Sequence, residues 1–357
     1  MSVDSSYYFG VMRPEPGLRG LAHSWIKSYL ENRTQTVTID NVSSGELTVE
    51  CGVPQGSVLG PKLFLLYIND ITEVSDLLKF ILFADDTTIL CSHSDINSLI
   101  LTLNHELQKL YDWFAANKLS LNISKTNYMI FNGAPGYDTT PPLTINGSAI
   151  ERVKVSKFLG LHVDDKLSWK SHINTVQSKL SRTLPAMYHA RPFVNDSTLR
   201  TIYNALFLPH LSYCSEIWGN TYISSLSKII TTQKKAIRLV CRTGKYTPST
   251  PLFKKLNLLK FTDLVEFKTS LVMHKAFNLN LPPNNQKYFQ LRETMYATKH
   301  RNKFTQKPHR TNGKSFSLSI KGVKIWNSLD CTLTSIFSHP IFKRTLKKKI
   351  LDSYQVD

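Results

Sequence analysis

The amino-acid sequence predicts an α+β protein with its strands in the first half and a mostly helical second half. Up to about residue 163, short alternating apolar segments are separated by residues that favour turns. From residue 169 onward, apolar residues recur at helical spacing and strand signals become sparse. The chain has 357 residues, 41% of them hydrophobic, so it can bury a sizeable core and form two or three compact units.

Charge and composition narrow the class of protein. Lys and Arg number 44 against 26 Asp and Glu, and the formal charge of +18 favours binding to nucleic acid and, second, to a membrane surface. No apolar run reaches the roughly twenty residues that a membrane span needs, and the first residues lack the pattern of a signal peptide. The five cysteines form no Cys-x-x-Cys pair, which argues against zinc and against a disulfide framework. We therefore expect an intracellular protein, in the nucleus or cytoplasm, without zinc or a membrane span.

The first segments predict a helix followed by a hairpin. Residues 1–17 contain Gly and Pro with little periodicity and predict an irregular N-terminus. Apolar residues at helical spacing predict a helix over residues 18–30. Residues 36–39 and 47–51 alternate in period two on either side of a turn-rich link at residues 40–45, so we expect them to pair.

A loop rich in glycine and proline comes next and leads into an apolar helix over residues 62–71. The loop reads Gly52-Val53-Pro54-Gln55-Gly56-Ser57-Val58-Leu59-Gly60-Pro61. Glycine lets the backbone approach a ligand closely, and Gln55 and Ser57 add hydrogen-bond donors and acceptors. The alternative is a plain connection in which Ser57 caps the helix.

The stretch from Phe80 to Leu90 predicts a β-hairpin that carries two adjacent carboxylates at its tip. Apolar, strand-like runs lie on both sides of Asp85 and Asp86. Because burying two carboxylates costs their hydration, the tip must face water or a cation. Mg²⁺ prefers one or two carboxylates together with substrate phosphates, so the pair fits a magnesium site. The alternative is an ordinary polar turn.

A long helix and a lysine follow the hairpin. Apolar spacing predicts the helix over residues 96–114, with Asp95 as its N-cap. Lys125 stands before a predicted strand over residues 127–131. It is either an ordinary surface charge or a cation aimed at a phosphate.

Two more strand signals complete the first half. Asn146-Gly147 lies between alternating segments and predicts a hairpin over residues 143–150. Residues 158–163 predict one more strand, which ends at Asp164-Asp165. Since this second acidic pair also follows a strand, paired carboxylates alone do not distinguish a metal site from a turn.

The second half predicts helices and a basic C-terminal region. Helical spacing covers residues 172–189, 197–213, 223–241 and 252–278. Residues 287–324 are rich in Lys, Arg, Asn, Thr and Ser, and predict either a flexible linker or a surface that binds a polyanion. The scarcity of acids there favours the polyanion. A basic helix is expected around residues 342–350.

Four motifs, taken in order, resemble the reverse transcriptases of LINE-type, jockey-like non-LTR retrotransposons. The motifs are Gly52-Val53-Pro54-Gln55-Gly56-Ser57, Phe83-Ala84-Asp85-Asp86, Asn117-Lys118-Leu119-Ser120-Leu121-Asn122 with Lys125-Thr126, and Phe158-Leu159-Gly160-Leu161. The resemblance implies an RNA-directed DNA polymerase with a partial right-hand palm, an antiparallel sheet with packed helices, over residues 18–165. It also implies a helical, thumb-like region over residues 166–245 and a basic helical region over residues 246–357.

The resemblance implies roles for individual residues. Asp85 would bind Mg²⁺ and help to place a primer hydroxyl against an incoming dNTP, with Asp86 as its less stringent neighbour. The residues that would lie against template and nucleotide are Pro54, Gln55, Gly56, Ser57, Phe83 and Ala84. Lys125 would stand near the nucleotide phosphates, and Leu159-Gly160 would form the turn that grips the primer end. The implied partners are an RNA template, a DNA primer in an RNA–DNA hybrid, and dNTPs.

One part of the implied active site is missing from the sequence. These enzymes carry another aspartate on an earlier palm strand, in a motif like Ala-Phe-Asp-x-Val, whereas here only Asp4 lies near the expected place, without the apolar flanks. The preceding fingers are missing too, so we expect an N-terminally truncated polymerase that does not extend a primer. One alternative is a protein that binds RNA or RNA–DNA hybrid without catalysis. A nuclease is less favoured, because the further carboxylates or His of a hydrolytic metal pair are not found.

Overall fold

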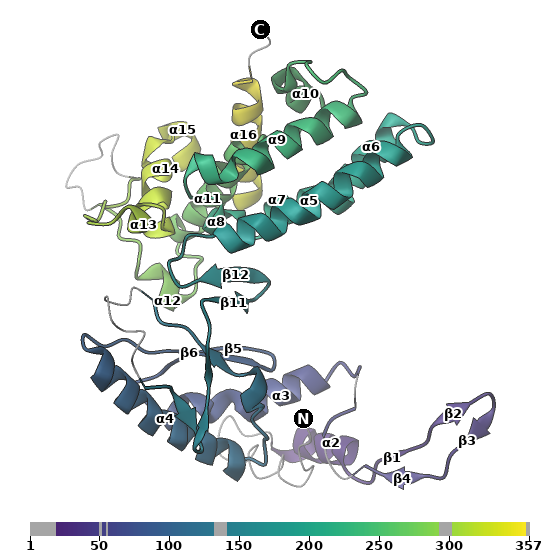
Figure 1. Ribbon diagram of the computed structural model, residues 1–357, viewed down its shortest axis with the longest axis vertical. Coiled ribbons are helices and arrows are strands. Elements are labelled where there is room, and N and C mark those ends of the chain that lie inside the picture. The colour runs from purple at the N-terminus through teal and green to yellow at the C-terminus, as the bar shows by residue number, and fades with distance from the viewer. Residues whose placement is uncertain (1–18, 50–51, 55, 132–140, 293–301, 355–357) are drawn as a thin grey trace. The chain divides into compact units, whose positions relative to one another are not determined.

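The computed structural model describes residues 19–49, 52–54, 56–131, 141–292 and 302–354 of a chain that divides into two compact units. Unit 1 comprises residues 1–154 and unit 2 comprises residues 155–357. Helices and short strands both occur, as the α+β prediction requires (Figure 1). The two units are defined by how the chain packs. The borders of the palm, thumb-like and C-terminal regions expected from the sequence therefore stay predictions.

In its described residues, unit 1 contains three α-helices, which lie close to the predicted positions. They are α2 (Gly20–Leu30), α3 (Gly60–Ile68) and α4 (Ile96–Ala116), with 3-10 turns η1 (Asn69–Val74) and η2 (Ile123–Lys125). The N-cap of α4 is confirmed, because the Asp95 carboxylate accepts the Ser98 N–H at 2.7 Å. That hydrogen bond lowers the pKa of the Asp95 carboxyl.

The strands form pairs instead of the single antiparallel sheet that was expected. They are β1 (Thr34–Gln35), β2 (Thr38–Ile39), β3 (Val42–Ser43), β4 (Leu47–Thr48), β5 (Lys79–Phe83), β6 (Asp86–Leu90), β7 (Asn127–Tyr128), β8 (Thr144–Ile145), β9 (Ser148–Ala149), β10 (Glu151–Arg152), β11 (Val155–Phe158) and β12 (Leu161–Asp164). In the described residues all six sheets are two-stranded, and only β7 with β10 is parallel. Most pairs join neighbours in the chain, because tight turns return each strand onto the preceding one.

The hairpin near the N-terminus differs from the prediction in its turn and in its pairing, because residues 47–48 pair with residues 34–35 and not with residues 36–39. The predicted link at residues 40–45 contains strand β3, and only Asp40 and Asn41 turn the chain, with φ of 50° and 65°. These angles suit a two-residue hairpin turn, in which Asp and Asn tolerate positive φ. β1 pairs with β4 and β2 with β3, and all eight strand residues are exposed.

One apolar core holds unit 1 together. Its most buried members come from all three α-helices, and include Leu30, Tyr67, Ile68, Ile100 and Leu110. The predicted hairpin at Asn146-Gly147 is confirmed as β8 and β9, and Ile145 joins this core. β7 covers only the first two residues of the strand predicted over residues 127–131.

Unit 2 is built mainly from helices. They are α5 (Lys170–Ala190), α6 (Asp196–Ile202), α7 (Leu208–Ser212), α8 (Ser215–Trp218), α9 (Ile223–Val240), α10 (Ser249–Lys255), α11 (Phe261–Phe277), α12 (Pro283–Gln286), α13 (Asn312–Ser315), α14 (Val323–Ser328), α15 (Cys331–Thr334) and α16 (His339–Asp352). The helix predicted over residues 197–213 is interrupted by a π-helical turn, η4 (Tyr203–Phe207). In the described part of the chain, no helix has the length and apolar character that crossing a bilayer requires.

The single helix predicted over residues 252–278 is wrong. α10 and α11 are separate, and Asn257 between them has a φ of 54°. The break buries Leu258 and Leu259, and the Phe261 N–H at the start of α11 donates to the Gln233 side chain at 2.8 Å. Helical spacing alone does not show such a break, because the apolar residues on both sides face the same core.

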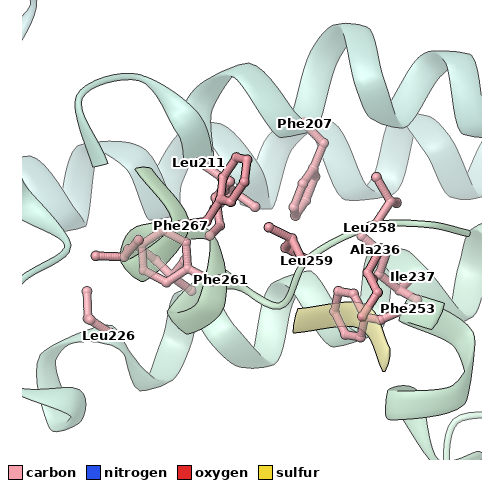
Figure 2. Close-up of a cluster of buried hydrophobic side chains, with 14 of the residues drawn as sticks. Phe207, Leu211, Leu226, Ala236, Ile237, Phe253, Leu258, Leu259, Phe261 and Phe267 are labelled. Atoms are coloured by element: carbon pink, nitrogen blue, oxygen red, sulfur yellow. The ribbon is translucent and has the colours of Figure 1, made fainter. Parts of the chain in front are cut away.

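The core of unit 2 gathers side chains from most of these helices. Figure 2 shows several of them together, among them Phe207, Leu211, Phe253 and Phe261. All four are fully buried. Since burial of one such side chain contributes about 1.5–3 kcal/mol, this cluster provides much of the stability of the unit.

The flexible linker considered for residues 287–324 is wrong for its middle part. Phe304 is fully buried and bridges to Leu291, and the Asn327 side chain bonds both the N–H and the C=O of Phe304, each at 2.9 Å. The Trp326 indole N–H donates to the Asn302 carbonyl at 2.9 Å. Residues Lys299, His300 and Arg301 of the predicted polyanion-binding stretch lie outside the described residues.

Candidate active site and primer-grip turn

The predicted hairpin around Asp85 and Asp86 is confirmed. β5 and β6 pair in an antiparallel register that places Phe83 opposite Asp86, so Ala84 and Asp85 form the turn. Ala84 has a φ of 52°, a left-handed conformation that costs free energy for a residue with a side chain. The turn therefore presents Asp85 at its tip and Asp86 at the first position of the next strand.

The two faces of this hairpin have different surroundings. Phe80, Leu82 and Ile89 lie on the inner face and pack against the core of unit 1. Because side chains alternate along a strand, Phe83 and Asp86 lie on the outer face, where Phe83 is 60% exposed. The strands that carry the acidic tip are therefore anchored in the core of unit 1 through their inner face, and their outer face is exposed at Phe83 and Asp86.

The carboxylates of Asp85 and Asp86 are available to a cation. Both residues are exposed, and within the described residues neither side chain accepts a hydrogen bond or forms an ion pair. The carboxylate of Asp164, from the second acidic pair, is instead buried and hydrogen-bonded. The residue is 8% exposed, and its carboxylate accepts the backbone N–H groups of Lys166, Ser168 and Trp169 at 2.8–3.2 Å. Asp164 thus stabilises a turn, whereas the tip fits the carboxylate pair that Mg²⁺ prefers.

The glycine-rich loop is held at both ends. Ser57 Oγ accepts the N–H of Gly60, the first residue of α3, at 3.0 Å, although Leu59 and not Ser57 stands at the N-cap position. The Arg33 guanidinium donates to the carbonyls of Leu30 and Gly52 and ties the start of the loop to the end of α2. Gln55 lies outside the described residues.

Gly56 is, together with Gly52, a glycine of this loop whose conformation excludes most side chains. Its φ is 79°, and a Cβ added there would have nothing within 4 Å. The Ser57 N–H donates to the Pro54 carbonyl at 3.3 Å, so a tight turn places Gly56 at the surface. Backbone approach to a ligand at this point is therefore sterically open.

Lys125 lies at the end of η2, and its side chain is exposed. Its backbone N–H is held by the Asn122 side chain at 3.2 Å, and its ammonium group pairs with no acid among the described residues. Val53 from the glycine-rich loop, Phe80 from the hairpin and Ile123 from η2 all pack against the same core. The core therefore fixes the three segments that carry the predicted site residues of unit 1.

Asp85 and Asp86 are a pair and not part of a larger cluster in the described structure. Among the residues that it describes, no three His, Cys, Asp or Glu side chains are gathered as a metal site requires. The described cysteines Cys91, Cys214, Cys241 and Cys331 are free thiols. The hairpin tip fits a magnesium ion whose other ligands are phosphate oxygens or water.

The strand predicted over residues 158–163 is wrong, because the chain reverses within it. Leu159 and Gly160 form a two-residue turn between β11 and β12, with φ of 44° and 82°. The resemblance implied a turn at these two residues, and the alternating apolar pattern concealed it because a two-residue turn leaves the alternation intact on both sides.

Tyr213 holds this turn. Its hydroxyl donates to the Leu159 carbonyl at 2.6 Å, and a Cβ on Gly160 would lie 3.4 Å from its ring. The indole N–H of Trp218 donates in turn to the Tyr213 carbonyl at 2.8 Å. The sequence patterns did not predict these contacts of Tyr213 and Trp218, or those of Arg33.

His172 contacts both the β11–β12 hairpin and Trp218, which also bonds Tyr213. Its ring lies 5.2 Å from the fully buried Trp218 ring, edge to face, and its Nδ1 accepts the His162 N–H at 3.3 Å. Burial, followed by the positive charge of His162 and Lys179, lowers the pKa of His172 to about 4. The imidazole is therefore neutral at pH 7 and acts as an acceptor.

Unit 2 is expected to lose stability as the pH falls from 6.5 toward 4. In this range the unfolded chain binds a proton at His172 and the folded chain does not, so protonation favours unfolding by up to roughly 3 kcal/mol. The buried His274 and the half-buried His339 also have lowered pKa values and act in the same direction. Urea unfolding at pH 7 and pH 4.5 measures the loss, and His172→Gln should reduce it. An unchanged pH dependence in that variant would contradict the assignment.

The sequence of this chain is similar to those of known polymerases. Residues 12–163 match the family described as reverse transcriptase (RNA-dependent DNA polymerase). An RNA-directed DNA polymerase from mobile element jockey of Drosophila melanogaster is 28% identical over 270 residues, which cover 73% of this chain and 29% of the relative. A probable RNA-directed DNA polymerase from transposon X-element of Drosophila melanogaster is 29% identical over 279 residues, covering 72% and 30%. A probable polymerase from transposon BS of the same species is 28% identical over 255 residues, covering 69% and 28%.

The extent of these matches matters for the domain organisation. The chain spans less than a third of the length of these relatives. Because the matches cover about 70% of the chain, they continue beyond residue 163 into the helical unit. Residues 12–163 are thus similar to the reverse transcriptase family, and the chain is similar to the polymerases of jockey-like non-LTR mobile elements.

Proposed function

We propose that this chain carries the Asp85–Asp86 part of an RNA-directed DNA polymerase site that uses Mg²⁺. The observation that carries the proposal is the hairpin tip, where two exposed carboxylates without protein partners in the described structure stand on strands anchored in the core. Phosphoryl transfer depends on positioning and on neutralisation of charge, which carboxylate-held metal ions supply. The substrates are a DNA primer on an RNA template and dNTPs.

The other residues of unit 1 contribute contacts rather than metal ligands. Lys125, which pairs with no acid in the described structure, places a positive charge for the nucleotide phosphates, and Gly56 offers open backbone to template or nucleotide. The exposed ring of Phe83 lies across the strand pair from Asp86 and supplies an apolar surface for a sugar or base. Bound Mg²⁺ would offset the charge of the triphosphate in this position.

The turn at Leu159-Gly160 is proposed to contact the primer end. Two observations support the role: the turn presents backbone at a tight reversal, and Tyr213 fixes its conformation through the Leu159 carbonyl. A fixed turn holds a primer end without further loss of conformational freedom on binding. The alternative function, binding of RNA or RNA–DNA hybrid without catalysis, uses the same turn and the same basic charge.

On its own, the chain is expected not to extend a DNA primer annealed to an RNA template. A two-metal site needs a further bridging carboxylate, and the palm motif that would carry it is not found in the sequence. The measurement is extension of an end-labelled primer with dNTPs and Mg²⁺, with an intact reverse transcriptase as positive control.

Two outcomes of that assay distinguish the candidate functions. Retention of the RNA–DNA hybrid on a native gel without any extension would agree with binding alone. Extension that requires Mg²⁺ and disappears in Asp85→Ala would overturn the expected inactivity while supporting the assignment of Asp85.

A further inference from the structure

Two exposed aromatic rings lie on loops at one end of the unit 2 helices. Among the described large apolar side chains of this unit, Phe193 and Tyr246 are the most exposed, at 86% and 88%. Phe193 belongs to the connection between α5 and α6, and Tyr246 to the connection between α9 and α10. Exposure of two such rings leaves hydrophobic free energy unused, which a ligand that covers them would recover.

Arg242 joins the two loops. Its Nε donates to the Asp196 carboxylate at 2.6 Å, and its guanidinium also donates to the carbonyl of Val194, next to Phe193. On the other side, Arg238 Nε donates to the carbonyl of Thr247, next to Tyr246, at 2.7 Å. The rings therefore stand on neighbouring loops that arginine side chains hold in place.

The backbone of both loops is also constrained. The Phe193 N–H donates to the Ala190 carbonyl at 3.0 Å, and Pro192 precedes Phe193. The Thr247 N–H donates to the Gly244 carbonyl at 3.2 Å, so Lys245 and Tyr246 are the central residues of a tight turn. Because the loops are already ordered, a ligand that stacks on these rings loses little binding free energy to the ordering of a loop.

The charge around the rings is positive. Between residues 166 and 247 the only acidic residues are Asp196 and Glu216, and each is paired, with Arg242 and with Lys268 at 3.3 Å respectively. Arg191 and Lys245 flank the rings in the sequence, and Lys245 Nζ lies 5.5 Å from the centre of the Tyr246 ring. The rings thus stand in a local excess of positive charge.

We propose that Phe193 and Tyr246 form a stacking platform for unpaired bases of a single-stranded nucleic acid, with Arg191 and Lys245 beside its phosphates. Aromatic rings combined with cations are the recognition chemistry of single strands, whose bases are free to stack. A membrane surface is less favoured, because the rings stand on two short turns and not on an amphipathic helix with a continuous apolar face. The proposal goes beyond the polymerase function, since the platform lies outside residues 12–163 and needs neither Mg²⁺ nor dNTPs.

The test measures binding of a fluorescein-labelled oligodeoxyuridine to the full chain by anisotropy, without Mg²⁺. The double variant Phe193→Ala, Tyr246→Ala should bind about fivefold or more weakly, since each stacked base contributes on the order of 1 kcal/mol or more. Phe337→Ala is the matched control, because Phe337 is 76% exposed and lies outside both loops. A duplex of the same length should bind the double variant and the unaltered chain equally.

Further variants separate stacking from charge. Tyr246→Phe keeps the ring and should retain binding, whereas Lys245→Gln should lower the slope of log affinity against log salt by roughly 0.7. Photo-cross-linking of 5-iodouracil in the strand should label peptides that contain Phe193 or Tyr246. Unchanged affinity of the double variant, an equal loss for duplex, or labelling elsewhere would overturn the platform. So would binding to phosphatidylserine vesicles that is stronger than strand binding and is lost in the double variant.

Discussion

Asp85→Asn is expected to weaken binding of a divalent cation at the β5–β6 hairpin at least about a hundredfold. Changes to groups that only orient metal ligands already cost 10–100-fold in affinity, and this change removes the charge of a proposed ligand itself. The amide has nearly the same shape, and Asp85 makes no described contact that the hairpin depends on, so the turn is expected to survive. The change should therefore lower the affinity for the cation without unfolding the hairpin.

Mn²⁺ is a suitable probe for this site, because it shares the preference of Mg²⁺ for oxygen ligands and its free form is measured by electron paramagnetic resonance. Asp76→Asn is the matched control, since it removes the same charge from an exposed carboxylate in unit 1 outside the hairpin. Asp86→Asn should give a smaller loss than Asp85→Asn. Equal Mn²⁺ affinity in the Asp85 and Asp76 variants would refute a metal site at the tip.

Trp218→Ala is expected to destabilise unit 2 by about 3–5 kcal/mol, the usual cost of truncating a buried tryptophan. Trp218 is fully buried and stacks on Phe261 with ring centres 5.2 Å apart. Its loss also removes the hydrogen bond to the Tyr213 carbonyl and the ring edge against His172. The support of the Leu159-Gly160 turn and the core are therefore damaged by the same change.

Urea unfolding of the full chain, followed by hydrogen exchange of peptides from unit 2, measures this effect separately for the unit. Trp25→Ala serves as control, because Trp25 is 60% exposed on α2 and its removal should change stability by less than about 0.5 kcal/mol. A loss below about 1 kcal/mol in Trp218→Ala would contradict the role assigned to this ring. Trp218→Phe keeps an aromatic ring but not the N–H donor, so its loss of stability should fall between those of Trp218→Ala and Trp25→Ala.

Several features of the fold could be predicted from the sequence because they depend on neighbours in the chain. The turn at Asn146-Gly147 and the acidic hairpin at Asp85 follow from local backbone preferences. The N-cap at Asp95 follows from the N–H groups that the start of every helix leaves free. The reverse transcriptase resemblance also came from short motifs and agrees with the match over residues 12–163.

Other features could not be predicted because local pattern does not encode them. The family resemblance implied the turn at Leu159-Gly160, but the apolar periodicity did not, and this periodicity also runs on unchanged across the break between α10 and α11. The burial of Phe304 within a Lys- and Arg-rich segment depends on Asn327, which lies 23 residues later. Average composition therefore left a flexible linker open as an alternative, where long-range contacts make an ordered structure.

The acidic hairpin shows most clearly which features depend on local sequence and which depend on tertiary packing. Strand propensity and turn chemistry are local properties, so the sequence predicts that Asp85 and Asp86 stand at a hairpin tip. Their difference from Asp164 arises only when the chain packs, because the Asp164 carboxylate then accepts three N–H groups of the following turn while the tip carboxylates stay exposed. Availability to a cation depends on burial and on competing donors, and both are set when the chain packs.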